Sequence, residues 1–125
     1  MSKTGSVAVQ VENILDEYNK RVKDTTTNAI EKTSKEAVSK LKNTSPKRSG
    51  KYARGWTVKR ERGAGGIATV TVHNRVYQLT HLLENGHIVR NKNGTYGRVN
   101  GVEHIAPVEE WAASELPAEI ERELR

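Results

Sequence analysis

Four histidines and one carboxylate in the second half of the chain have types and spacings that suit metal or acid–base chemistry. His81 and Glu84 are three residues apart, which places them on one face of a helix, and His87 and His104 follow downstream. The His-Glu-x-x-His spacing of a zinc protease helix is absent. We therefore interpret these side chains as packing and hydrogen-bonding around a turn. The sequence predicts no metal, no cofactor and no catalytic residue.

The sequence also lacks the residues that other kinds of catalysis need. The sequence contains no cysteine, which excludes a thiolate zinc site, a thiol nucleophile and a disulfide framework. It also lacks a Gly-x-Ser-x-Gly elbow, a phosphate-binding loop and a dinucleotide fingerprint. No stretch approaches the ~18 apolar residues of a membrane span. We expect a soluble, non-enzymatic protein with no small-molecule substrate and no membrane partner.

A basic stretch offers a second kind of chemistry, the binding of phosphates. Residues 40–62 carry nine basic residues against Glu61 alone, with Tyr52 and Trp56 interleaved among them. Basic groups neutralise phosphates and aromatic rings stack on bases, so the stretch favours nucleic acid. However, residues 103–125 carry a net charge of −5 and are an equally suitable partner for these cations. Both interpretations remain open.

The N-terminal third predicts one long helix. Apolar residues recur at three- and four-residue steps from Val7 to Leu41, which predicts a helix over residues 6–42. At 1.5 Å per residue this helix is roughly 50 Å long, so part of its apolar stripe should meet another helix or another chain. The β-branched residues 25–27 mark the point where it could break into two. Pro46 prevents its continuation.

The middle of the chain, residues 52–101, predicts β-structure. Alternation from Tyr52 to Arg60, glycines at 63–66 and a second run to His73 indicate a β-hairpin. Val76–Leu79 is expected to add a third strand. Asn93-Gly94 indicates a second hairpin.

A short helical turn separates these strands, and a longer helix follows them. Thr80 is expected to cap the turn, and Gly86 is expected to end it with a positive φ. Pro107 and an apolar stripe predict a final helix over residues 107–124, kinked at Pro117.

These elements predict a single domain over residues 1–125 of α+β class. The N-terminal helix and the C-terminal helix should pack on one face of a small antiparallel β-sheet, with Trp56 and Trp111 in the core. Leu, Ile and Val make up only 26 residues and there is no Phe, so the core is lean. Some apolar surface is therefore expected to be buried only against other subunits.

Three blocks of sequence resemble a known family. They are residues 44–52 (TSPKRSGKY) leading to Trp56, residues 77–87 (YQLTHLLENGH) and residues 104–107 (HIAP). Together they are similar to the head-tail connector, neck, tail-completion or minor capsid proteins of long-tailed bacteriophages and prophages. The resemblance runs from about residue 5 to the C-terminus.

The resemblance implies a structural virion protein at the joint between head and tail, made in the cytoplasm of the bacterial host. Its implied partners are further copies of itself in a ring and other junction proteins, with passive contact to DNA in the channel. The family supplies no catalytic residues. The alternative function is a small nucleic-acid-binding protein that uses residues 40–62.

Two sets of residues follow as candidate sites. The structural motif consists of Thr80, His81, Leu82, Leu83, Glu84, Gly86, His87 and His104. We expect assembly to bring basic residues of one subunit against acidic residues of the next, or to place the basic set along the DNA passage. The basic set is Lys40, Lys42, Lys47, Arg48, Lys51 and Arg54, and the acidic set is Glu109, Glu110, Glu115 and Glu119.

Overall fold

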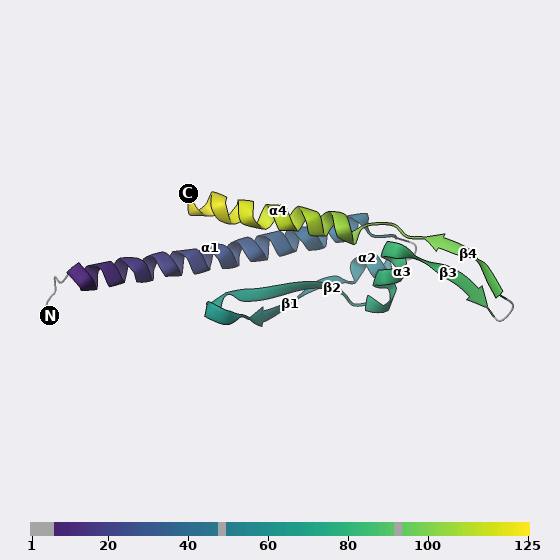
Figure 1. The fold of residues 1–125 in the computed structure, drawn as a ribbon, viewed down its shortest axis with the longest axis horizontal. Coiled ribbons are helices and arrows are strands. Elements are labelled where there is room, and N and C mark those ends of the chain that lie inside the picture. The colour runs from purple at the N-terminus through teal and green to yellow at the C-terminus, as the bar shows by residue number, and fades with distance from the viewer. Residues whose placement is uncertain (1–6, 48–49, 92–93) are drawn as a thin grey trace.

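The computed structural model describes residues 7–47, 50–91 and 94–125 and has the α+β class predicted from the sequence (Figure 1). The N-terminal and C-terminal helices are both present, with small antiparallel sheets between them. The elements in chain order are α1 (Val7–Thr44), α2 (Lys51–Arg54), β1 (Trp56–Arg62), β2 (Ala68–Asn74), α3 (Thr80–Asn85), β3 (Gly86–Asn91), β4 (Gly94–Asn100) and α4 (Ile105–Leu124). Short 3₁₀ turns, η1 (Ala64–Gly66) and η2 (Tyr77–Leu79), complete the set.

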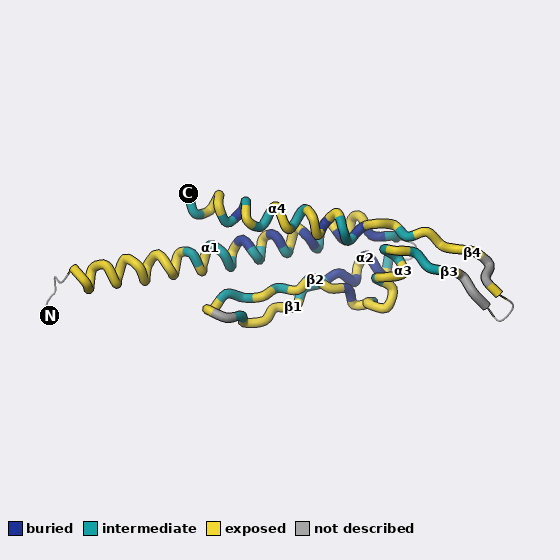
Figure 2. Tube along the Cα trace, viewed as in Figure 1, coloured by how far each residue is buried: buried dark blue, intermediate teal, exposed yellow. Residues whose placement is uncertain are grey.

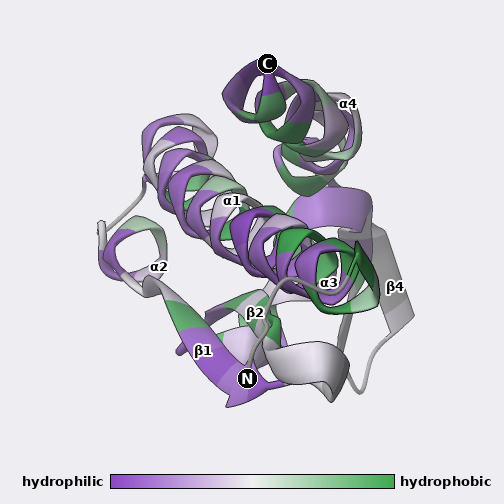
Figure 3. Ribbon diagram, turned by 90° about the vertical axis from the view of Figure 1, so that its left-hand side faces the viewer, coloured by the Kyte–Doolittle hydropathy of each residue, from purple (hydrophilic) through white to green (hydrophobic). Residues whose placement is uncertain are grey.

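The helix α1 is the central element, with α4 along one side and the β1–β2 hairpin along the other (Figures 1 and 3). The helix α4 runs antiparallel to the C-terminal half of α1. Lys32 Nζ lies 2.7 Å from Glu119 Oε1, and Arg21 donates to the backbone carbonyl of Leu124. The β3–β4 hairpin lies at the end of the molecule opposite the N-terminal end of α1 (Figure 1).

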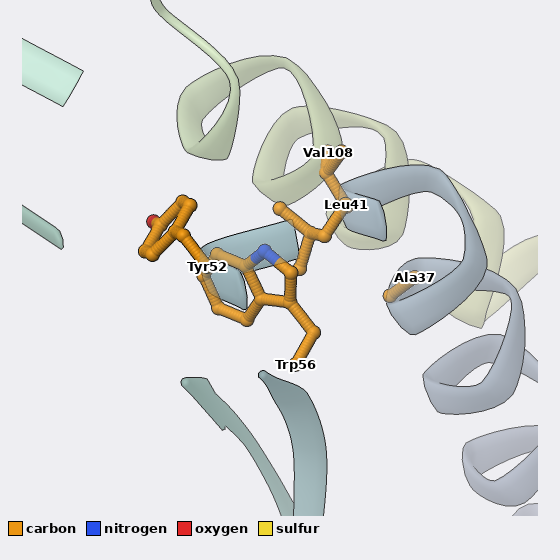
Figure 4. Close-up of a cluster of buried hydrophobic side chains, with 5 residues drawn as sticks. All are labelled: Ala37, Leu41, Tyr52, Trp56 and Val108. Carbon is orange, nitrogen blue, oxygen red and sulfur yellow. The ribbon is translucent and has the colours of Figure 1, made fainter. Parts of the chain in front are cut away.

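The hydrophobic core is a small cluster where α1, α2, β1 and α4 meet (Figure 4). Every fourth residue of α1 from Ala29 to Leu41 is buried, because this spacing keeps the side chains on the face that meets α4 and the hairpin. Figure 2 shows that burial is confined to this half of α1. The buried apolar cluster consists of Ala37, Leu41, Tyr52, Trp56 and Val108. Trp111 is partly buried at its edge.

The helix α1 is continuous through Thr25, Thr26 and Thr27. These three side chains are half-buried, since α4 extends beside α1 as far as Arg21. Tertiary packing therefore overrides the weak helix propensity of the threonines. The helix α4 is also continuous through a residue that disfavours helix, Pro117, and this proline is exposed.

Two predictions for the middle of the chain were wrong. The first strand begins at Trp56, because Gly50 adopts a φ of 78° and residues 51–54 then form a helical turn. The segment Tyr77–Leu79 forms a 3₁₀ turn, so no third strand joins the hairpin and the strands make two separate two-stranded sheets. Just before this turn, Asn74 Oδ1 accepts the N–H of Val76 at 2.8 Å, which bends the chain where β2 ends.

The predicted turn of helix at 80–85 is confirmed as α3. The prediction that Thr80 caps this helix was wrong. Leu79 precedes the helix, and the described residues supply no capping side chain there. The positive φ of Gly86 is confirmed at 79°.

We predict that Leu41→Ala lowers the free energy of unfolding by about 2–5 kcal/mol, because Leu41 is only 4% exposed and its removal leaves a cavity. Leu15→Ala on the same helix is the matched control. Leu15 is 54% exposed, so Leu15→Ala should lower the free energy of unfolding by about 0.5 kcal/mol or less. Urea denaturation followed by circular dichroism measures both, and equal losses would contradict the position of the core.

Candidate functional site

Residues from the three recognised blocks of sequence meet in one buried cluster of polar and aromatic side chains. We call this cluster the hub. Its rings pack edge to face, with 5.6 Å between the centroids of Tyr52 and Trp56 and 5.5 Å between those of Tyr52 and His104. The hub consists of Ser45, Tyr52, Trp56, Asn74, Glu84 and His104.

The carboxylate of Glu84 caps the start of α4. Its Oε1 accepts the backbone N–H groups of His104 and Ile105 at 2.8 and 2.9 Å, and its Oε2 accepts that of Ala106 at 3.1 Å. These N–H groups have no partner inside the helix, and the helix N-terminus carries partial positive charge. His104, the residue that precedes α4, makes no side-chain cap to the helix within the described part of the chain. A residue twenty positions away therefore does the work of a local cap.

His104 links this cap to Tyr52. Its Nδ1 lies 2.7 Å from the carbonyl oxygen of Val102 and 2.9 Å from Glu84 Oε1, and its Nε2 lies 2.8 Å from the Tyr52 hydroxyl. A carbonyl can only accept, so Nδ1 carries a proton, and Nε2 shares a hydrogen bond with the Tyr52 hydroxyl. Because His104 is only 1% exposed, this arrangement is enclosed by the fold.

The same environment shifts the pKa values of two side chains, Glu84 and Tyr52. Burial raises the pKa of Glu84, but the three backbone hydrogen bonds and His104 outweigh it, so its pKa lies below the ordinary value. Burial raises the pKa of Tyr52 above its ordinary value, against a hydrogen bond with Thr80. Glu84 is thus held as a carboxylate and Tyr52 as a neutral phenol.

The remaining hub residues tie the end of α1 to the hairpin. The indole N–H of Trp56 donates to Ser45 Oγ at 2.7 Å, and Ser45 in turn donates to the carbonyl oxygen of Leu41. Asn74 Nδ2 donates to the backbone carbonyl of Tyr52 at 2.8 Å. Asn74 was not predicted from the sequence, and the only signal was its place before a turn. The chemistry of the hub is therefore internal support, since its polar groups bind one another.

Two glycines bring the backbone after α3 close to that after β4. A Cβ added to Gly86 would lie 2.3 Å from the carbonyl oxygen of Val99, and one added to Gly101 would lie 2.3 Å from that of Glu84. Gly86 combines its positive φ with a ψ of 178°, a conformation essentially restricted to glycine. This contact fixes the position of Glu84 relative to α4.

The other residues of the predicted motif lie outside the hub. His81 and Leu82 are exposed, whereas Leu83 packs against the core. His87 is partly buried, and its Nδ1 has no hydrogen-bond partner among the described residues. Within those residues no three His, Asp or Glu side chains are grouped to hold a metal ion.

The basic candidates are spread over the surface near the end of α1. Lys42, Lys47 and Arg54 line one open hollow, and Lys40 Nζ lies 4.7 Å from the centre of the Trp111 ring. Lys51 begins α2, and Arg48 lies outside the described residues.

The acidic candidates divide into two pairs. Glu109 and Glu110 are exposed on α4. Glu119 is only 3% exposed and pairs with Lys32 and Arg122 of the same chain, while Glu115 also contacts Arg122. Hydrogen bonds from Lys32 and Arg122 lower the pKa of Glu119. Glu119 therefore helps to hold α4 against α1, whereas the pair of Glu115 with Arg122 lies within α4.

The polar groups of the hub therefore support the fold from inside. Residues 10–86 match the family model described as "Bacteriophage HK97-gp10, putative tail-component". The match covers more than half of the chain, which therefore belongs to this family of phage structural proteins, as the resemblance implied. No curated protein and no solved structure matches the chain. None of the helices in the described ranges has the length and apolar character needed to cross a bilayer.

We predict that Glu84→Gln lowers the free energy of unfolding by roughly 1–3 kcal/mol, because one amide oxygen replaces two charged acceptors. The folded-state pKa of Glu84 is lowered, so its contribution is complete above about pH 4.3 and is lost as the pH falls through the folded-state pKa. The difference between the two proteins should thus shrink in acid. Glu121→Gln, an exposed change on α4, is the control for urea denaturation at several pH values.

Gly86→Ala should also destabilise the protein, by about 1–3 kcal/mol or more, because of the added Cβ and the positive φ. Gly65→Ala is the control: Gly65 also has a positive φ, but its Cβ would meet nothing within 4 Å. Thermal melting compares the two. A smaller loss at Gly86 than at Gly65 would contradict the close backbone contact.

Proposed function

We propose that the protein is a structural subunit of the head-to-tail junction of a long-tailed phage or prophage, where it forms a ring or docks on one. Membership of the tail-component family supports a place in the virion. The observation that carries the proposal is the N-terminal part of α1, which the described part of the chain leaves bare. From Val7 to Lys20 every residue is exposed, including six large apolar side chains. A chain with this much uncovered helix is suited to being completed by neighbouring copies and by other junction proteins.

Charge supports the same proposal. The open hollow lined by Lys42, Lys47 and Arg54 is positive, whereas Glu109 and Glu110 give exposed negative charge to the start of α4. In a closed ring each subunit presents two different surfaces, and opposite charges favour correct docking. We therefore propose that Lys42, Lys47 and Arg54 contact Glu109 and Glu110 of an adjacent subunit, with a passage for DNA as the alternative position of the basic set. Glu115 and Glu119 are left out, because their partners lie within the chain.

The alternative of a nucleic-acid-binding protein loses its aromatic support. The rings of Tyr52 and Trp56 are buried in the hub, so neither is a platform for stacking a base. One of the cations, Arg60, forms a two-pronged ion pair with Glu31.

Solution mass over a range of concentrations, with electron microscopy of whatever assembles, tests the proposed function. We expect a concentration-dependent assembly with a closed, channel-bearing outline. A phage particle that lacks this protein should have full heads without attached tails. Normal tailed particles without the protein would contradict a place at the junction.

A charge-reversal experiment tests the surfaces. The double change Lys47→Glu and Arg54→Glu should weaken self-association, and Glu109→Lys with Glu110→Lys should restore it. Arg62→Glu, which reverses an exposed charge at the far end of β1, is the control. If assembly is unchanged while the affinity for duplex DNA falls, the basic set faces nucleic acid instead.

A further inference from the structure

The large apolar side chains that are exposed in the described part of the chain fall into two groups. The first group is on residues 7–20 of α1, which we call the arm, and its six members are between 48% and 72% exposed. The second group lies between residues 77 and 102, where its six members are between 40% and 70% exposed. Figure 2 shows the arm as a bare helix, and Figure 1 places the two groups toward opposite ends of the molecule.

The arm continues the face that α4 covers farther along the same helix. Val11, Leu15 and Tyr18 share this face with Val22 and Ala29, since all are separated by three, four or seven residues. The helix α4 ends beside Arg21, so the covered stripe becomes uncovered there without a change in its apolar character. The arm is thus an unfinished helix interface rather than a solvent-facing helix.

The second group includes a receptive surface around η2 and α3, which we call the corner. Tyr77, Leu79 and Leu82 are exposed there, beside a hollow of about 270 Å³. The walls of that hollow include Pro46, Val76, Leu79 and Leu83. An apolar hollow bordered by exposed apolar side chains is the shape that the ridge of an amphipathic helix fits.

Charge makes the two surfaces complementary. Glu12 and Glu17 lie on either side of the apolar stripe of the arm, and with Asp16 they outnumber Lys20, which gives residues 7–20 a net charge of −2. Lys51 lies on the wall of the corner hollow itself. An acidic helix with an apolar ridge therefore meets an apolar hollow with a cation on its wall.

We propose that the arm of one copy docks on the corner of a second copy. The arm cannot reach the corner of its own chain, because both belong to one continuous fold and lie toward its opposite ends (Figure 1). The contact is heterologous, so each copy donates one arm and receives another, as a closed ring requires. The inference rests on the proposed self-assembly and specifies the surface that drives it.

The size of the contact predicts weak pairwise association. The arm is roughly 21 Å long, and one face of such a helix covers well below the ~800 Å² per partner of a standard interface. A ring gains from closure, since every copy then makes two such contacts. Free subunits should therefore associate only at high concentration.

Ile14→Asp in the full chain tests the arm. Ile14 is 64% exposed, so the fold should melt at the same temperature while self-association weakens about tenfold or more. Asn13→Asp introduces the same charge at the neighbouring position, on the opposite side of the arm, and should leave assembly unchanged. Assembly that survives Ile14→Asp would overturn the inference and leave the proposed ring standing. A wild-type chain that stays monomeric at every concentration and in the virion would overturn both.

Cross-linking identifies the partner surface, and the absence of native cysteine makes it clean. Tyr18→Cys in the arm and Tyr77→Cys in the corner are prepared as separate single variants and mixed with a short bis-maleimide. We expect cross-linked dimers from the mixture and from neither variant alone. Dimers from Tyr18→Cys alone would show that arms pair with each other. Assembly without cross-links in the mixture would show that another surface receives the arm, and either result overturns docking on the corner.

Discussion

Three hydrogen bonds to the carboxylate of Glu84 hold the start of α4 in its place in the fold. They fix the first turn of α4 on the short helix α3, and so determine which part of α1 the remainder of α4 can cover. His104 adds a second connection, because its ring joins the same carboxylate to Tyr52 and the core. A helix with its cap built from another element keeps its place only when both elements are folded, which makes the fold cooperative.

The hub compensates for a core with few apolar residues. Seven apolar residues are fully buried in the described chain, and three of these are alanines. Hydrogen bonds such as those of Trp56 with Ser45 and Asn74 with Tyr52 place the aromatic rings that fill the remaining space. Directional bonds of this kind specify one arrangement where a small core alone would allow several.

Because the core uses only part of the apolar stripe of α1, the rest of that stripe is exposed. The same helix that is buried at Ala29 and Leu41 is bare at Val11 and Leu15, so one apolar stripe is covered by the rest of the chain at one end and exposed at the other. The division falls where α4 stops. In the proposed assembly, the exposed part of this stripe is the surface that a neighbouring copy covers.

The elements with local causes follow directly from the amino-acid sequence. The spacing of apolar residues in α1 and α4, the hairpins and the positive φ of Gly86 were all predictable, because periodicity and glycine act within a few residues. Three other features arise from long-range packing: Glu84 caps α4, Asn74 donates to the backbone carbonyl of Tyr52, and Glu119 pairs with Lys32 of the same chain. Those contacts depend on which distant segments become neighbours in the fold. The type of a carboxylate or amide residue does not specify which distant group it will bind.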